Sequence, residues 1–332
     1  MNIDYYKIGM FGSTTLTLLL QFAALYLIVF VSPRTMRSYI RYLVICTVVE
    51  MLFTITYGLL LCYSPPQTHP GLGLYVLGIS KYFGTKFVNF CAASLYALGA
   101  MELLSQDICL LYRLCAVHPN RELRARFSSI RWTVINYGIA VGFSLLVGIG
   151  LYVTIANQNE YEVIIQSWTS TLQTTIDLSV TRVLLRNNTP YYWFFQHAMG
   201  VFIVLSHVAY FVLIVRILLY LRSATISKRA ITLNRQLTVL LGAQICVPLI
   251  LFVLPYIVML FQMQTKPTDN RQFVQIAMFF FSFHNAINAL LTIFFVGPFR
   301  TAVLNGIRRL VYGKHSFVVY NLRTRSSFSV TV

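Results

Sequence analysis

Long stretches of apolar residues alternate with short polar segments along the whole 332-residue chain. A membrane-spanning helix needs roughly 20 mostly apolar residues, because each residue rises about 1.5 Å through a hydrocarbon core about 30 Å thick. Seven windows meet this requirement, and five of them contain no Asp, Glu, Lys or Arg, namely 8–33, 132–159, 187–215, 236–265 and 272–299. We predict an all-α, seven-transmembrane helix bundle with helices at about 8–33, 42–62, 87–112, 132–156, 191–216, 236–262 and 273–297.

These helices form one predicted domain, residues 1–312, which is followed by a tail at 313–332. Between residues 299 and 312, Val303, Ile307 and Leu310 lie near one helical face with arginines around it. This pattern suits a short helix on the inner membrane surface, although an ordinary solvated tail also accounts for it.

Composition and charge support a membrane protein of one orientation. The chain is 57% hydrophobic and 11% charged, whereas soluble domains carry about 25% charged residues. Segments 32–41, 113–131, 216–235 and 298–332 hold 3, 5, 5 and 6 of the 26 Lys and Arg residues. Basic loops stay in the cytoplasm, so we expect the N-terminus outside, the C-terminus inside and a multi-pass location in the plasma membrane. The net charge of +17 then reflects topology and attraction to the lipid bilayer, not a nucleic-acid partner.

Polar residues inside the predicted helices share one depth. When residues are counted from the cytoplasmic helix ends, the layer contains Glu50, Glu102, His207, Gln244 and Asn288. Ionisable groups within the membrane cost several kcal/mol and mark function by default. Two interpretations stay open, a network that rearranges in a conformational switch and polar contacts that only hold helices together.

The predicted sixth helix carries a candidate hinge. Pro248 and Pro255 lie seven residues apart, so both remove backbone donors on nearly the same side. Gln244, one turn earlier, is placed to satisfy a freed carbonyl. A static kink explains the same two prolines.

Other side chains are candidates for a ligand pocket and for modification. Aromatic residues gather near the outer helix ends, and a mostly apolar, outward-facing pocket would suit a small, fairly hydrophobic ligand. The candidate lining residues are Asn89, Ser94, Tyr96, His197, Tyr256, Phe280 and His284. Asn187 begins a glycosylation sequon. Cys62 and Cys91 lie near the outer face, and their pairing is left open.

Motifs in the sixth and seventh helices indicate a family. The run Leu233-Asn234-Arg235-Gln236-Leu237 with Gln244, Pro248 and Pro255, and His284-Asn285-Ala286-Ile287-Asn288 closing with Gly297-Pro298-Phe299-Arg300, resemble nematode serpentine chemoreceptors. The resemblance is to the Str superfamily, most closely class H or class I. Tyr112-Arg113 is similar to the inner end of the third helix in that superfamily, although class H leads us to expect a Glu-Asn-Arg type triplet there.

The resemblance implies a G-protein-coupled receptor that detects environmental or pheromonal small molecules in the cilium of a sensory neuron. It also implies a heterotrimeric G protein as partner, with Tyr112 and Arg113 as contact candidates and with His284 and Arg300 as signature residues of the seventh helix. The basic residues of the predicted cytoplasmic side add further contact candidates, Arg222, Lys228, Arg229 and Arg300.

Two other functional classes compete with a receptor. An enzyme is disfavoured, since the six His residues include no His-x-x-x-His pair and no phosphate-binding glycine loop occurs. We therefore expect no catalytic residues, metal or cofactor. A channel or transporter using the polar layer is the alternative, although seven spans do not divide into equal repeats. Small residues at 138–148 leave a receptor dimer open, with packing inside the bundle favoured.

Overall fold

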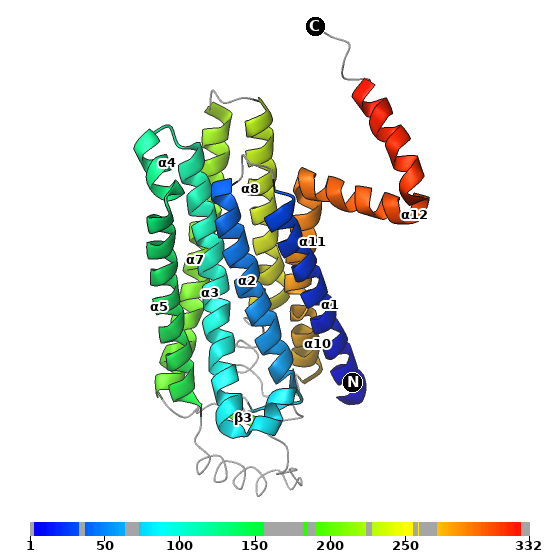
Figure 1. The fold of residues 1–332 in the computed structure, drawn as a ribbon. Helices are drawn as coiled ribbons and strands as arrows, with labels where there is room; N and C mark the ends of the chain where they lie inside the picture. Colours follow the sequence, from blue (N-terminus) through cyan, green and yellow to red (C-terminus); the bar gives the residue numbers. More distant parts are fainter. Residues whose placement is uncertain are drawn as a thin grey trace, which may run out of the picture.

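The computed structural model describes residues 3–32, 37–63, 73–155, 182–184, 190–223, 228–254, 258 and 271–326. Most of these residues are helical (Figure 1). The α-helices are α1 (Ile3–Phe30), α2 (Arg37–Leu60), α3 (Thr85–Val117), α4 (Arg121–Ser128), α5 (Ile130–Thr154), α7 (Pro190–Ser223), α8 (Lys228–Pro248), α10 (Arg271–Phe281), α11 (His284–Phe295) and α12 (Gly297–Ser326). A 3-10 helix, η2, spans Ile79–Phe83, and a π-helical turn, η3, spans Leu249–Val253.

Seven of the described segments are long and apolar enough to cross a membrane, which confirms the predicted bundle. Six of them lie within α1, α2, α3, α5, α7 and α8 with the first residues of η3. The seventh, Gln275–Phe295, is made of α10 and α11 together. A turn at Ser282 and Phe283 divides it, where the prediction had one continuous helix.

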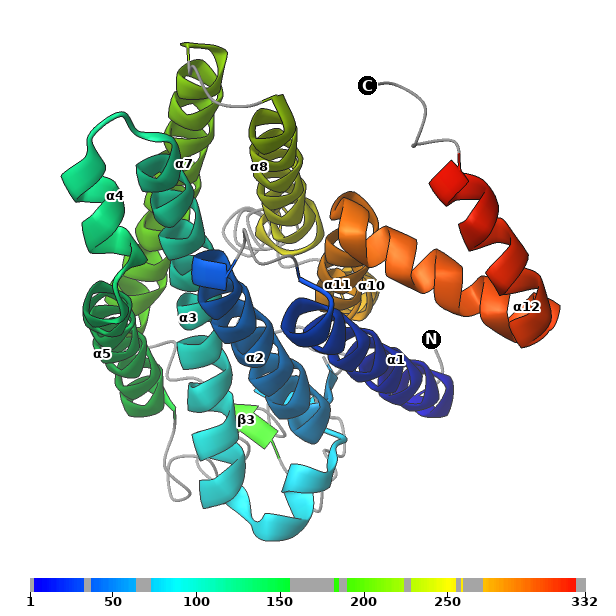
Figure 2. The same ribbon diagram turned by 45° about the horizontal axis from the view of Figure 1, so that its top comes forward.

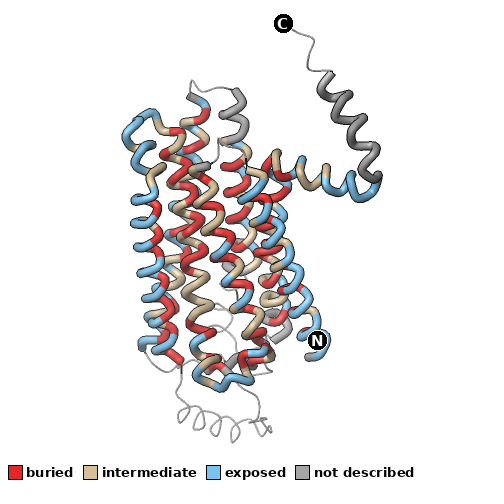
Figure 3. The backbone as a smooth tube through the Cα atoms, in the orientation of Figure 1, coloured by how far each residue is buried: buried red, intermediate tan, exposed pale blue. Residues whose placement is uncertain are grey.

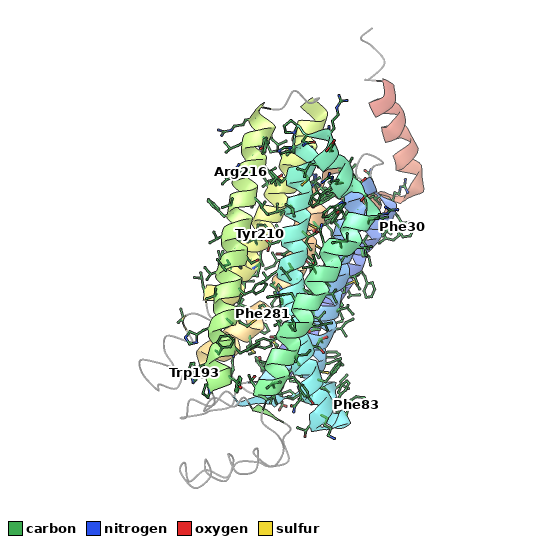
Figure 4. The ribbon with its side chains drawn as sticks, turned by 90° about the vertical axis from the view of Figure 1, so that its left-hand side faces the viewer. Phe30, Phe83, Trp193, Tyr210, Arg216 and Phe281 are labelled. Carbon is green, nitrogen blue, oxygen red and sulfur yellow. The ribbon has the colours of Figure 1, made fainter. Side chains whose placement is uncertain are left out.

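The two ends of the bundle differ in chemistry. At one end, which we call the basic end, lie α4, the start of α2, the end of α7, the start of α8, and α12 leading away sideways (Figures 1 and 2). These elements belong to the four basic segments of the sequence. The N-terminus and the strands lie at the opposite end, which we call the N-terminal end. Arg216 and Phe30 lie towards the basic end, and Trp193 and Phe83 towards the other (Figure 4).

A small sheet closes part of the N-terminal end. Its strands pair antiparallel in the order β1 (Cys62–Tyr63), β2 (Gly73–Val76), β3 (Arg182–Leu184). Cys62, Val76 and Val183 are buried in one apolar cluster with residues of α2 and α3. The sheet therefore joins two loops that lie more than a hundred residues apart, an arrangement that the local sequence pattern does not predict.

Burial follows the division between the bundle interior and its surroundings. Buried residues line the helix faces that meet inside the bundle, and exposed residues line the outer faces (Figure 3). Those outer faces are apolar, as on α5, where Ile139, Leu146 and Ile149 are exposed. Exposed apolar helix surface of this extent is expected where lipid is the solvent.

Some small residues of α5 face the interior of the bundle, and others lie on its exposed outer face. A Cβ atom at Gly148 would lie 3.1 Å from the Cβ of Ala97, so this glycine allows α3 to approach α5 closely. Gly138 and Gly142 are exposed, with nothing within 4 Å of an added Cβ. Packing inside the bundle therefore accounts for Gly148 and for the buried Ala140 and Ser144, but not for Gly138 and Gly142.

Some helix bounds differ from the prediction. Polar residues next to the predicted apolar segments also adopt helical structure, some of them with capping hydrogen bonds. The unpredicted α4 is capped by Asn120, whose side chain accepts hydrogen bonds from the backbone of Glu122 and Leu123. The seventh-helix ending continues into α12, which is longer than the predicted surface helix at 299–312.

Candidate functional site

A buried polar layer joins α2, α3, α8 and α11 in the middle of the bundle. The α11 sequence places His284, Asn288 and Thr292 one turn apart on one face, with Asn285 beside them. All four are buried. The face turns towards the two acidic residues of the neighbouring helices, Glu50 and Glu102, which are also buried.

The contact between His284 and Glu102 links α11 to α3. The Nε2 of His284 lies 3.2 Å from the Oε1 of Glu102, and its Nδ1 lies 2.8 Å from the carbonyl oxygen of Phe281. The imidazole stacks on the Phe281 ring and meets Phe53 edge-on. Both ring nitrogens thus face acceptors, within an otherwise aromatic environment.

The contacts of Glu50 link α11 to α2. Asn288 donates through Nδ2 to the Oε1 of Glu50 at 3.5 Å, and Asn285 donates to its backbone carbonyl at 3.3 Å. Asn285 also donates to the hydroxyl of Thr54 at 3.2 Å. Asn285 therefore donates hydrogen bonds to both the backbone and a side chain of α2.

Gln244 completes the layer from α8. Its Nε2 donates to the hydroxyl of Thr292 at 2.9 Å and to the carbonyl of Asn288 at 3.2 Å. Our prediction that Gln244 satisfies a carbonyl freed by Pro248 is therefore wrong, because the amide turns to α11. Directly after Pro248 the helix widens into η3, in which the Leu254 N–H reaches Leu249. Pro255 lies outside the described residues.

A second site lies at the basic end around Arg113 of α3. This arginine is 4% exposed, and its guanidinium carbon lies 3.6 Å from the centre of the Tyr39 ring of α2. Its Nη1 donates to the Oδ1 of Asn234 of α8 at 2.8 Å. Tyr112 stacks on Tyr42 with ring centres 4.5 Å apart. We call Tyr39 and Asn234 the arginine cage.

The G-protein candidates from the sequence divide between buried and exposed positions. Tyr112 and Arg113 are buried, so neither presents its side chain at the surface in this conformation. Arg222 and Arg300 are exposed. The side chains of Lys228 and Arg229, in the first turn of α8, lie outside the described residues.

The candidate pocket residues do not converge as a set. Asn89, Ser94 and Tyr96 lie half-buried on α3, whereas His197 and Phe280 are exposed on the outside of α7 and α10. His284 belongs to the polar layer. Tyr256 and the sequon residue Asn187 lie outside the described residues.

Tyr96 nevertheless has partners that the sequence did not indicate. Its ring lies 6.3 Å from that of Phe195, and the side chain of the buried Gln196 lies beside the hydroxyls of Tyr96 and Tyr192. Gln196 also lines a groove with Trp193, His197 and Gly200 along α7. One-turn spacing on α7 is the signal that would have grouped Tyr192, Gln196 and Gly200.

His207 does not join the layer to which we assigned it. Its Nδ1 lies 2.7 Å from the carbonyl of Ile203 on its own helix. The neighbouring Ser206 instead links α7 to α3 by donating to Asp107 at 2.7 Å. Counting residues along a helix sets depth but not the direction in which a side chain points.

The cysteines are free thiols, and none of the six forms a disulfide within the described residues. Cys62 and Cys91 are both buried, and burial raises the pKa of the Cys62 thiol to about 12. Cys46 and Cys109 face each other across α2 and α3 with sulfur atoms 3.3 Å apart. The structure shows no group of three or more metal-ligating side chains among its described residues.

Seven apolar helices, a buried polar layer that links four of them and an arginine cage at the basic end define a seven-transmembrane receptor. Comparison with known families identifies which kind. The family "Serpentine type 7TM GPCR chemoreceptor Srh" matches residues 2–309, and the chain belongs to this family. The predicted resemblance is thereby confirmed, and the family consists of chemoreceptors, not enzymes. No curated protein matches the chain at a significant level.

Proposed function

We propose that this chemoreceptor lies in the plasma membrane of a sensory neuron, in its cilium, with the basic end in the cytoplasm. The distribution of basic residues supports this orientation, since 19 of the 26 lie in the four segments that meet at that end. The N-terminal end then faces the environment. The ligand is a small, fairly apolar molecule, and the partner at the basic end is a heterotrimeric G protein.

The ligand site is built around Tyr96. Tyr96 and Phe195 supply aromatic surface between α3 and α7, and the Gln196 amide supplies one polar group beside them. Few polar groups on mostly apolar walls suit a small ligand with one hydrogen-bonding function. His284 lies further from the N-terminal end than Tyr96. A displacement of α3 would move His284 through its contact with Glu102.

The arginine cage is the observation that carries the proposed signalling mechanism. Arg113 is buried against Tyr39 of α2 and Asn234 of α8. A movement of α8 away from α3 would break the bond to Asn234 and open the basic end. The weakened helix at Pro248 and η3 gives α8 a place to bend. Exposed Arg222 and Arg300 flank this opening as contacts for the partner, with Lys228 and Arg229 as further candidates.

The test is a screen of the full-length receptor, with surface expression confirmed, against small volatile and pheromone-like compounds. The readout is nucleotide exchange on a co-expressed G protein. An active compound is expected to lose its effect in Tyr96→Ala with normal surface expression. Arg113→Ala should abolish exchange for every compound, because Arg113, once released from Asn234, is itself a proposed contact for the G protein. Arg235→Ala is the matched control, because this neighbour of Asn234 is exposed.

Two results would contradict the proposal. A current evoked by an active compound that persists without any G protein would favour a channel over a G-protein-coupled receptor. Equal nucleotide exchange by Arg113→Ala and the unaltered receptor would exclude the arginine cage from signalling.

A further inference from the structure

The polar layer contains a buried carboxyl group, that of Glu50, for which the other residues of the layer supply no positive charge. His284 faces two acceptors, the Phe281 carbonyl and the Glu102 carboxylate. Since a neutral imidazole has one N–H, the His284–Glu102 pair contains two protons, either both on the ring or one on the ring and one on the carboxyl group. The net charge of the pair is zero in both arrangements.

Because the His284–Glu102 pair is neutral as a whole, it supplies no positive charge to Glu50. Glu50 is 7% exposed, and its carboxylate accepts one hydrogen bond, from the neutral amide of Asn288. Among the described residues, no Lys or Arg lies within ion-pair distance of it. An isolated carboxylate is costly in an environment of low dielectric, so a positive charge at this position is strongly favoured.

Buried oxygens around Glu50 indicate where that charge would lie. The Oδ1 atoms of Asn285 and Asn288 have no hydrogen-bond partner in the part of the chain that the structure describes. Asn285 is 1% exposed and Asn288 0%. Each oxygen belongs to an amide whose nitrogen already contacts Glu50. Two fully buried acceptors without donors therefore adjoin the unbalanced carboxylate.

A third amide comes from α1. Thr17 of α1 donates to the carbonyl of Ser282 at 3.3 Å. α1 and α11 run in the same direction along the bundle, so Gln21 lies one turn further, at the level of Asn285. Gln21 is completely buried, and both atoms of its amide lack a partner among the described residues.

We propose that Glu50, Asn285 and Asn288, with Gln21 near them, form a binding site for one small monovalent cation. The charge is supplied by a proton on the Glu50 carboxylate or by a sodium ion held by the carboxylate and amide oxygens. Oxygen ligands suit a hard cation, and one positive charge makes the layer neutral. The titratable and charged groups that face Glu50 from the packed helices are Glu102 and Cys109 of α3 and His284 of α11.

The site predicts how stability depends on the medium, whichever ligand the receptor detects. A protonated Glu50 makes the folded state bind more protons than the unfolded state near neutral pH, so stability falls as pH rises. A sodium ion that binds only the folded state raises stability with its concentration. The two sources are thus separable by experiment.

The test measures the melting temperature of the purified full-length receptor in sodium chloride and in choline chloride of equal ionic strength, each at one pH unit below and above neutrality. A shift of about 5 °C on replacing choline by sodium identifies sodium. A comparable rise at the lower pH in choline, without a sodium effect, identifies a proton. Glu50→Gln should remove whichever dependence is found, because glutamine neither ionises nor requires a counterion.

The control is Glu122→Gln, which neutralises an exposed acid in the first turn of α4 and should keep both dependences. The proposal is overturned if the unaltered receptor shows neither dependence, or if Glu50→Gln keeps it in full. Where Glu50→Gln does not reach the membrane, Glu50→Asp is used, since it keeps the charge but withdraws it by one methylene. The change of melting temperature with sodium or with pH should then differ from that of the unaltered receptor, and an identical change also overturns the proposal.

Discussion

The Nη1 of Arg113 lies 2.8 Å from the Oδ1 of Asn234, so a hydrogen bond joins α3 to α8 at the basic end. The Nε and Nη2 of Arg113 have no hydrogen-bond partner among the described residues. The bond to Asn234 is therefore the main polar restraint on this buried cation, together with the Tyr39 ring. Its loss is expected to change the balance between resting and signalling conformations.

Replacing Asn234 by Ala should raise signalling in the absence of a ligand. A hydrogen bond to a charged group contributes about 1.5 kcal/mol, which corresponds to about a tenfold change in a conformational equilibrium. The measurement is basal nucleotide exchange at matched surface expression. Arg235→Ala, at the exposed neighbouring position, should leave basal exchange unchanged. If basal nucleotide exchange of the Asn234→Ala receptor equalled that of the unaltered receptor, the bond would not restrain α8.

Glu102 and His284 should be coupled in stability. Glu102→Gln and His284→Ala each remove one partner of the 3.2 Å contact, so the double variant should lose less stability than the sum of the single variants. We expect a coupling of about 1–3 kcal/mol, measured by denaturation of the purified receptor. Glu122→Gln combined with His284→Ala is the control pair, and its effects should add. Additive effects in the first pair would show that the contact contributes no net stability.

Gly78→Ala should prevent normal folding. A Cβ atom at this position would meet the carbonyl group of Leu59, which belongs to the backbone and cannot move aside cheaply. The expected cost is about 3 kcal/mol or more, seen as loss of surface expression. Gly12→Ala is the matched control, because an added Cβ there meets nothing within 4 Å and alanine favours a helix. Equal surface expression of the two variants would contradict the close approach of residues 59 and 78.

Cys46 and Cys109 should form a disulfide on treatment with a membrane-permeable diazene oxidant. Their sulfur atoms are 3.3 Å apart, and the oxidant takes up the two thiol hydrogens as the sulfur–sulfur bond forms. The product is measured as a crosslinked peptide pair by mass spectrometry. It should disappear in Cys46→Ser and persist in Cys115→Ser. Failure to form the crosslink in the unaltered receptor would mean that α2 and α3 hold these thiols further apart.

Depth along the helices followed from the sequence, because a rise of about 1.5 Å per residue places each residue relative to the membrane surface. Glu50, Gln244 and Asn288 were predicted at one level, and the structure brings them into contacts of one layer. Rotation about the helix axis did not follow from depth. His207, predicted at the same level, contacts its own helix instead.

By itself the sequence determined the seven membrane spans, the separation of a basic end from an N-terminal end, and the family motifs of the last two helices. These features depend on composition and spacing within short segments. In the hydrocarbon core of a membrane an apolar segment forms a helix, because the helix satisfies its own backbone hydrogen bonds. Only the tertiary structure decided that Asn234 and Tyr39 enclose Arg113, that His284 pairs with Glu102, and that two distant loops form one sheet. Each of these contacts joins residues from separate elements, and it depends on how the helices pack and turn towards one another.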